Sequence, residues 1–302
     1  MNGPVYIGID AGGTRLRLAA EATSGKQTTF ETAGVNLWRD GIEIAARRVN
    51  QAVVRAASEL GEARRAVVLA GIAGAMNESL AEELGKRLVK LEGPALNPVR
   101  ILSDVQLAHY AAHGPSPGMT VVVGTGSVVF VRSPSGQERV VGGWGYRLGD
   151  EGSGYAIARA ALRSLADAVD RSRPSPFEHL VTRNPDEPLR SALLRFMYGD
   201  DSRIQNLTPA VIVMARKGVT EAVSVVDEQI RLLADQIVEA RTESIGLPHR
   251  ITLTGGLSSN PWYVERLVSR LRTLDPGLDV AAQDIDAANA ALGMAKALVN
   301  CA

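Results

Sequence analysis

The chain has 302 residues, equal numbers of basic (33) and acidic (33) side chains, and 45% hydrophobic residues. This composition is typical of a globular protein of about two domains, and it excludes a basic surface for nucleic acid and an apolar run long enough to span a membrane. The single cysteine, Cys301, excludes a disulfide within the chain and a zinc or iron–sulfur site built from several cysteines. No signal peptide is recognisable near Met1, so we expect a cytoplasmic location.

The chain opens with an apolar segment, residues 5–10, that predicts a buried strand ending in Asp10. A turn with Gly12 and Gly13 comes next, and residues 14–21 and 26–33 predict two return strands. Backbone N–H groups of a glycine turn can hold phosphate oxygens because no Cβ is in the way. A carboxylate at the strand end can hold a metal ion or its water.

Helix and strand patterns then alternate up to residue 112. Residues 42–60 and a segment capped by Asn77 predict helices, residues 65–70 and 99–102 predict strands, and the second of these strands delivers Ser103 and Asp104. This order predicts an α/β domain with a mixed sheet.

A segment rich in proline and glycine, residues 114–118, is the best candidate for a domain boundary. Beyond it the chain repeats its opening pattern, with a strand at 119–123, a glycine turn at 124–127 and return strands at 128–132 and 137–141. Helical patterns and a strand at 250–254 come later. The sequence therefore predicts two halves of similar fold, each with a backbone cradle for an anion.

The stretch at residues 142–156 combines six glycines with the neighbouring carboxylates Asp150 and Glu151 and with large side chains such as Trp144 and Tyr146. A flexible linker would be rich in serine and proline and would not carry such aromatic residues. We expect backbone to approach a ligand closely here.

Taken in order, these motifs resemble the N-acetylglucosamine kinase-like branch of the superfamily of sugar kinases, heat-shock ATPases and actin. That branch also contains glucosamine kinases and the ATPase activators of benzoyl-CoA reductase-type enzymes. The segments that carry the resemblance are residues 7–14, 36–38, 103–104, 124–127, 148–153, 254–258 and 290–293.

The resemblance implies an α/β protein of two ribonuclease H-like (actin-like ATPase) domains, residues 1–115 and 116–286, with ATP and a sugar in a cleft between them. It also implies that a helix at about 287–302 packs back on the first domain. The positions that match ATP-binding motifs are Gly12, Gly13, Thr14, Gly124, Thr125, Gly126, Ser127, Gly255, Gly256 and Ser258. The positions that match the sugar site are Asn36, Leu37, Trp38, Asp104 and Asp150.

The activity that the resemblance implies is ATP-dependent phosphorylation of the 6-hydroxyl of an amino sugar, N-acetylglucosamine or glucosamine. Asp104 matches the catalytic aspartate and would be the general base. Asp10 would hold Mg²⁺, directly or through water, because phosphoryl transfer depends on positioning and on neutralising phosphate charge. A homodimer would be compatible with the family.

Several alternatives remain open at this stage. The chain could be an ATPase activator or a nucleotide-dependent regulator without sugar transfer, although Cys301 alone cannot supply two cluster ligands per subunit. Asp104 could act only as a helix cap, and Trp38 could be a core residue. Ala73 stands where relatives have serine near the sugar, so the sequence does not choose between N-acetylglucosamine, glucosamine, N-acetylmuramate and glucose. We favour a helix-stabilising role for Glu151.

Overall fold

The structure is a computed structural model that describes residues 3–61, 64–182, 184, 186–198, 202–244, 246–247 and 249–300. Cys301 lies outside these residues. The chain divides into two compact units, Met1–Pro115 with Ile285–Ala302, and Ser116–Asp284. We describe each unit by itself.

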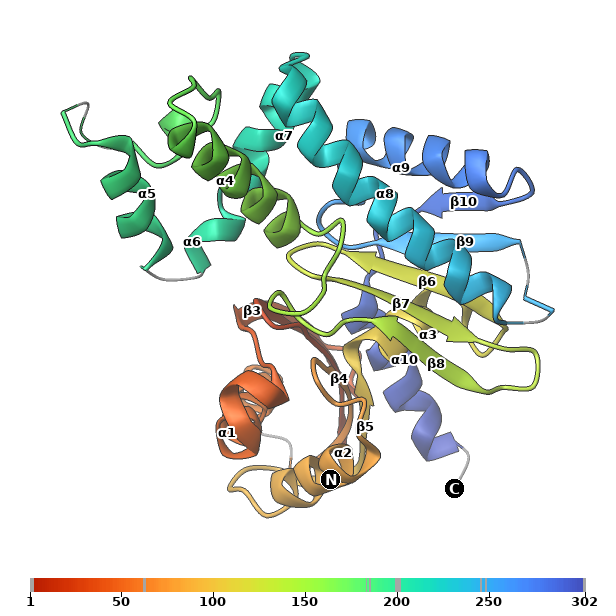
Figure 1. Cartoon of the computed structure of the whole chain (residues 1–302). Coiled ribbons are helices and arrows are strands. Elements are labelled where there is room, and N and C mark those ends of the chain that lie inside the picture. The colour runs from red at the N-terminus through yellow and green to blue at the C-terminus, as the bar shows by residue number, and fades with distance from the viewer. Residues whose placement is uncertain are drawn as a thin grey trace. The chain divides into compact units, whose positions relative to one another are not determined.

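The first unit is built on a five-stranded mixed sheet of order β3-β2-β1-β4-β5 (Figure 1). Strands β1 to β3 are antiparallel neighbours, whereas β4 and β5 run parallel to β1. The strands are β1 (Val5–Ala11), β2 (Arg15–Ala22), β3 (Gln27–Ala33), β4 (Arg65–Ile72) and β5 (Ala95–Ser103). The helices of this unit are α1 (Leu37–Glu59), α2 (Glu78–Leu88), α3 (Asp104–His113) and α10 (Ala287–Asn300).

Helices cover both faces of this sheet because its central strands β1 and β4 are apolar on both sides. In β4, Val68 and Ala70 belong to the same hydrophobic cluster as buried residues of α1 and α2, whereas Val67 and Leu69 join the cluster that contains α3 and α10. Side chains alternate along a strand, so the two helix pairs lie on opposite faces.

Two glycines let helices approach the sheet directly. A Cβ on Gly8 of β1 would overlap the backbone of α10 at Leu292 N. A Cβ on Gly71 of β4 would lie 2.6 Å from Leu107 Cδ2 of α3. Since real Cβ atoms do not make such contacts, both glycines fix how closely these helices sit on the strands.

The second unit repeats the strand arrangement, with the sheet order β10-β9-β6-β7-β8. Its strands are β6 (Gly118–Val123), β7 (Ser127–Arg132), β8 (Glu138–Gly142), β9 (Arg250–Thr254) and β10 (Asp279–Ala282). Its helices are α4 (Gly154–Asp170), η1 (Glu178–Leu180), α5 (Leu189–Met197), α6 (Ser202–Gln205), α7 (Thr208–Arg216), α8 (Thr220–Thr242) and α9 (Pro261–Leu274). Figure 1 shows α8 and α9 beside each other on the sheet, while α5, α6 and α7 gather around α4.

The elements differ from the sequence expectations at four places. Helix α1 begins at Leu37, before the predicted start at residue 42, and is interrupted at Gly41, whose φ and ψ are 76° and 161°. Strand β5 starts at Ala95, earlier than predicted. The short edge strand β10 and the helix α6 had no clear sequence signal.

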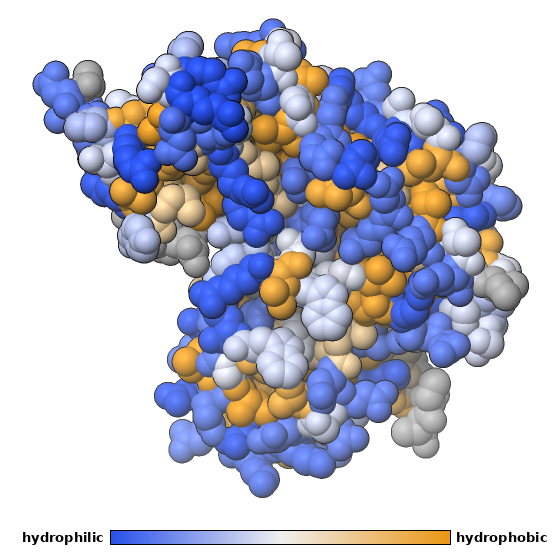
Figure 2. Space-filling model, in the orientation of Figure 1, coloured by the Kyte–Doolittle hydropathy of each residue, from blue (hydrophilic) through white to orange (hydrophobic). Residues whose placement is uncertain are grey.

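Hydrophilic residues cover most of the face shown in Figure 2. None of the helices in the described ranges is long and apolar enough to cross a membrane.

Candidate active site

The first glycine turn, residues 12–14, joins β1 to β2 and has all three of its carbonyl oxygens occupied. In chain order they accept hydrogen bonds from Val35 N (3.0 Å), Arg39 Nη1 (2.8 Å) and Gly34 N (3.1 Å). In the part of the chain that the structure describes, the amides of the turn's last two residues have no acceptor. The turn therefore keeps backbone N–H donors available for an anion.

Two carboxylates with raised pKa values lie near this turn. Burial raises the pKa of Asp10, in β1, to about 6; the charge of Arg17 opposes the rise and that of Asp286 adds to it. Asp104 is the first residue of α3, and burial together with the charge of Asp10 raises the pKa of Asp104 to about 6. The amide of Val105 donates to Asp104 Oδ1 at 3.0 Å. Asp10 and Asp104 thus interact electrostatically, and a bound cation would relieve their repulsion.

The start of α3 is fixed by residues other than Asp104. Ser103 is the N-cap and forms a capping box with Gln106, so capping is not the role of Asp104. Leu107, one turn into the helix, rests against Gly71 of the sheet. Together these contacts hold the carboxylate of Asp104 at the end of β5.

Asn36 precedes α1 and caps it. Its Oδ1 accepts from Trp38 N (2.9 Å) and Arg39 N (3.2 Å), and its Nδ2 donors have no acceptor among the described residues. Leu37 N donates to Ala73 O at 2.9 Å, which ties this segment to the end of β4. Leu37 is buried, whereas Trp38 is 72% exposed, so the core alternative for Trp38 is wrong.

A charged network that sequence reasoning missed surrounds Asn36. The carboxylate of Asp40 accepts from Asn36 N (2.9 Å), from Arg39 Nε (2.9 Å) and Nη2 (2.7 Å), and from Arg48 Nη1 (3.3 Å). The hydrogen bond from Arg39 is the largest of the effects that lower the pKa of Asp40. Arg48 Nη1 also donates to Gly34 O at 2.9 Å. The sequence signal was an Arg-Asp pair directly after the Asn36 motif, but one partner of this pair, Gly13 O, lies 26 positions away along the chain.

The second glycine turn, residues 124–127, is held in the same manner. Its first two carbonyl oxygens accept from Gly154 N (2.8 Å) and Tyr155 N (3.2 Å), and its third accepts from the turn's own first amide (2.9 Å). Ser127 Oγ donates to Glu151 O at 2.7 Å. Among the described residues, the amides of the second and third turn residues have no acceptor. This turn too presents N–H groups, although the Ser127 hydroxyl is used internally.

Asp150 joins the second turn to the glycine-rich stretch. It is 8% exposed and has a positive φ of 65°. Its carboxylate accepts from the amides of Ser127 and Gly145, and burial raises its pKa despite these bonds. A Cβ on Gly126 would lie 2.8 Å from Asp150 Oδ2, so only glycine fits there. Asp150 therefore has a structural function whether or not it contacts a ligand.

The predicted ATP-binding segment 255–258 packs against the residue that precedes the second glycine turn. Gly255 has a φ of 101°, and a Cβ there would lie 2.6 Å from Val123 O, the carbonyl that precedes the turn 124–127. Leu257 N donates to the same oxygen at 3.1 Å. Ser258 Oγ donates to Gly255 O at 2.6 Å. The two nucleotide motifs of this unit are therefore neighbours.

Two apolar side chains of the glycine-rich stretch extend into solvent. Trp144 is 76% exposed and Leu148 is 82% exposed. Tyr146 is placed differently, because its ring lies 4.7 Å from that of Tyr155. The stretch thus offers apolar surface beside Asp150.

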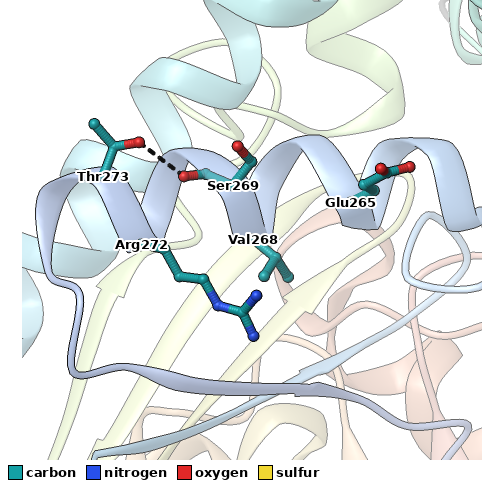
Figure 3. Close-up of a pocket in the computed structure, with 5 residues that line it drawn as sticks. All are labelled: Glu265, Val268, Ser269, Arg272 and Thr273. Carbon is teal, nitrogen blue, oxygen red and sulfur yellow. Dashed lines mark hydrogen bonds between the residues drawn. The ribbon is translucent and has the colours of Figure 1, made fainter.

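A separate hollow of about 490 Å³ lies along one face of α9 (Figure 3). Its lining residues all come from that helix: Glu265, Val268, Ser269, Arg272 and Thr273. None of them is a predicted site residue, so this hollow is distinct from the candidate site.

Each unit thus gathers its own share of the predicted residues. The first unit holds Asp10, the turn 12–14, the segment 36–38 and Asp104. The second holds the turn 124–127, Asp150 and the segment 255–258. No cluster of three or more His, Cys, Asp or Glu side chains suited to a metal occurs within the described ranges. Mg²⁺ does not require such a cluster, since it usually keeps several waters and binds one or two carboxylates plus substrate phosphates.

Comparison with known proteins identifies the family. The sequence profile of the BadF/BadG/BcrA/BcrD ATPase family matches residues 7–295. The chain belongs to this family. Family members are ATPases, and the two glycine turns with open amides fit nucleotide phosphates.

Characterised relatives match part of the chain. An N-acetylmuramic acid/N-acetylglucosamine kinase from Clostridium acetobutylicum is 26% identical over 171 residues, 55% of this chain and 54% of that protein. An N-acetyl-D-glucosamine kinase from Dictyostelium discoideum is 29% identical over 186 residues, 58% of each protein. The matches thus span little more than half the length of these relatives.

Solved structures match over nearly the whole chain. A putative N-acetylglucosamine kinase from Chromobacterium violaceum is 26% identical with a TM-score of 0.75, covering 97% of this chain and 99% of that one. A ROK hexokinase from Thermus thermophilus is 18% identical with a TM-score of 0.54, covering 99% and 100%. The fold is that of the actin-like ATPases and ROK kinases, as the sequence predicted.

Proposed function

We propose that this protein is an ATP-dependent kinase that phosphorylates the 6-hydroxyl of an amino sugar, N-acetylglucosamine or glucosamine. The observation that carries the proposal is Asp104, a carboxylate with a raised pKa next to Asp10 and the first glycine turn. The names of the relatives support the same class of substrate.

In this proposal Asp104 is the general base. A base is most effective when its pKa lies near the working pH, and the pKa of about 6 leaves Asp104 ionised at neutral pH yet more basic than an exposed aspartate. It would accept the proton of the attacking sugar hydroxyl. The capping box at Ser103 fixes the start of α3, and the amide of Val105 donates to one carboxylate oxygen of Asp104, Oδ1, at 3.0 Å.

The sugar would be bound by Asn36, with Leu37 and Trp38 beside it, and by Asp104 and Asp150. The free Nδ2 donors of Asn36 suit a hydroxyl oxygen. The exposed face of Trp38 can cover an apolar side of a sugar ring. Asp150 would contribute any lone pairs that the amides of Ser127 and Gly145 leave free.

ATP would be bound by the amides of the two glycine turns, 12–14 and 124–127, and by the segment 255–258. Asp10 would hold Mg²⁺ directly or through water. The residues fit this ion, because the charge of Asp286 raises the pKa of Asp10 and the charge of Asp10 raises that of Asp104, so a cation at Asp10 would be favoured. When bound, Mg²⁺ would offset the charge of the phosphates.

The proposal is tested by steady-state kinetics of the full chain with ATP, Mg²⁺ and four acceptors in parallel: glucosamine, N-acetylglucosamine, N-acetylmuramate and glucose. We expect sugar-dependent ADP formation with an amino sugar and a sugar 6-phosphate as product. ATP hydrolysis that no sugar stimulates would refute the kinase and favour an ATPase that drives a partner protein, a function that the family also suggests.

A further inference from the structure

Arg39 connects the segment that carries Asn36 to the first glycine turn. Its Nη1 donates to Gly13 O at 2.8 Å, across 26 positions of sequence. A Cβ on Gly13 would lie 3.8 Å from this Nη1 and 4.0 Å from Asn36 Nδ2. The guanidinium and the amide of Asn36 therefore both lie next to the same turn residue.

The orientation of the guanidinium is fixed from its other side. Asp40 accepts from Arg39 Nε at 2.9 Å and Nη2 at 2.7 Å, a paired contact that matches the planar fork of arginine. Asp40 is itself held by Asn36 N at 2.9 Å and Arg48 Nη1 at 3.3 Å. Although Arg39 is half-exposed, it is bound at three of its five N–H groups.

The bond to Gly13 O has a consequence for the next amide. In a planar trans peptide, the C=O and the N–H lie in the same plane and point in opposite directions. The guanidinium that holds Gly13 O therefore turns Thr14 N–H the other way. In the described part of the chain this N–H has no acceptor, so it stays available for an anionic ligand.

We infer that Arg39 is a positioning residue for phosphoryl transfer. It holds the Gly13–Thr14 peptide so that the Thr14 amide faces the phosphate, and it links that peptide to Asn36. The inference rests on the proposed function of the turn and of Asn36. It implies that sugar at Asn36 and ATP at the turn bind cooperatively, because both act on one rigid network.

The structure offers a matched control for an ordinary ion pair. Arg55, also on α1, donates through Nε to Glu59 Oε1 at 2.8 Å, and its side chain is 52% exposed compared with 55% for Arg39. Exposed pairs of this kind contribute little to stability. Arg55→Gln removes such a pair together with a cation–π contact, 3.9 Å to the centroid of the Phe30 ring, and neither contact involves the first glycine turn.

The experiment compares Arg39→Gln, Arg39→Lys and Arg55→Gln with the wild-type chain. It measures ATP affinity by calorimetry with and without the preferred amino sugar, steady-state kcat and sugar KM, and Tm. For Arg39→Gln we expect kcat about tenfold lower or more, ATP affinity about tenfold weaker, and loss of the sugar effect on ATP affinity. Because coupling between two ligands is reciprocal, sugar KM at saturating ATP should rise by the factor by which sugar strengthens ATP binding in the wild type, and Tm should match that of Arg55→Gln.

Arg39→Lys should behave like Arg39→Gln, since one ammonium cannot bind both Asp40 oxygens and Gly13 O in the same arrangement. The inference is wrong if Arg39→Gln has the kinetics of Arg55→Gln, if lysine restores full activity, or if the loss follows a fall in Tm. The ATP affinity measured without sugar does not depend on sugar phosphorylation. If the wild type phosphorylates no sugar, the proposed function fails, and the ATP affinities still decide the role of Arg39.

Discussion

Replacing Asp104 by asparagine should have two opposite effects on this protein. The variant keeps the size of the side chain and the capping box at Ser103, but it loses the charge and the ability to accept a proton. We expect kcat to fall by at least about 100-fold, the usual contribution of a general base. At the same time we expect the folded protein without ligands to become more stable at pH 8.

The gain in stability comes from the pKa of Asp104. The pKa rises from 3.8, the ordinary value, to about 6 in the folded protein, so above pH 6 the ionised carboxylate disfavours folding. A shift of this size corresponds to at most about 3 kcal/mol. Loss of a negative charge in the first turn of α3 costs about 0.3–1 kcal/mol, which leaves a net gain of roughly 2 kcal/mol.

The pH dependence of this gain has a definite sign. As the pH falls through 6, Asp104 becomes protonated in the folded wild type and its penalty shrinks; below 3.8 the folded and unfolded forms are both protonated and the penalty is gone. Asparagine does not titrate. The difference in free energy of unfolding between the variant and the wild type should therefore be largest above pH 7 and smaller at pH 5.

Urea unfolding of both proteins at pH 5 and pH 8, with EDTA to remove metal ions, measures this difference. Asp40→Asn is the control, because the pKa of Asp40 is lowered by Arg39 and its neutralisation should destabilise the fold. A variant at position 104 that is less stable than wild type at pH 8, or equally stabilised at both pH values, would refute the reasoning. Near-normal turnover would show that Asp104 is not the base.

Three further outcomes are expected. Gly71→Ala should destabilise the fold by about 1–3 kcal/mol in urea unfolding and should lower kcat. The reason is that the new Cβ would lie 2.6 Å from Leu107 Cδ2 and would move α3. Unchanged kcat and stability would contradict this prediction. Asn36→Ala should weaken sugar binding more than ATP binding, as measured by calorimetry. It should also lower the stability by about 1 kcal/mol, because α1 loses its N-cap. Equal losses of affinity for both ligands would place Asn36 outside the sugar site. The apparent pKa in the pH profile of kcat/KM should lie near 6, with activity lost on the acid side; a profile flat from pH 5 to 8 would argue against Asp104 as the base.

The sequence predicted those parts of the fold that depend on local pattern. Both strand–turn–strand units, the cap at Asn77 and the strand at 250–254 agree with the structure, because each depends on residues close together in the chain. The edge strand Asp279–Ala282 was missed because it is short and has few large apolar residues. The first turn of α1 was missed because Gly41 separates it from the periodic part of the helix.

The candidate site was only partly predictable for a different reason. The sequence shows carboxylates and glycine turns directly after predicted strands, and this pattern identified Asp10, Asp104 and the two turns. The hydrogen bond from Arg39 to Gly13 O joins residues 26 positions apart in the chain. The short distance between α3 and β4 depends on Leu107, which packs over Gly71. A glycine in a strand indicates that another element or a ligand approaches the backbone closely, but only the tertiary structure shows which one.

The contact between Gly8 and α10 also bears on how the protein forms during synthesis. The first unit is made of two segments of the chain, Met1–Pro115 and Ile285–Ala302. It is therefore complete only after the second segment has been synthesised. At usual rates of translation the ribosome needs roughly 10–30 s to make the intervening residues. During that time the face of β1 that receives α10 has no helix on it, whereas the second unit is continuous in sequence and can complete its core first. A nascent chain halted before residue 285 should therefore bind hydrophobic-surface probes and chaperones through its first unit.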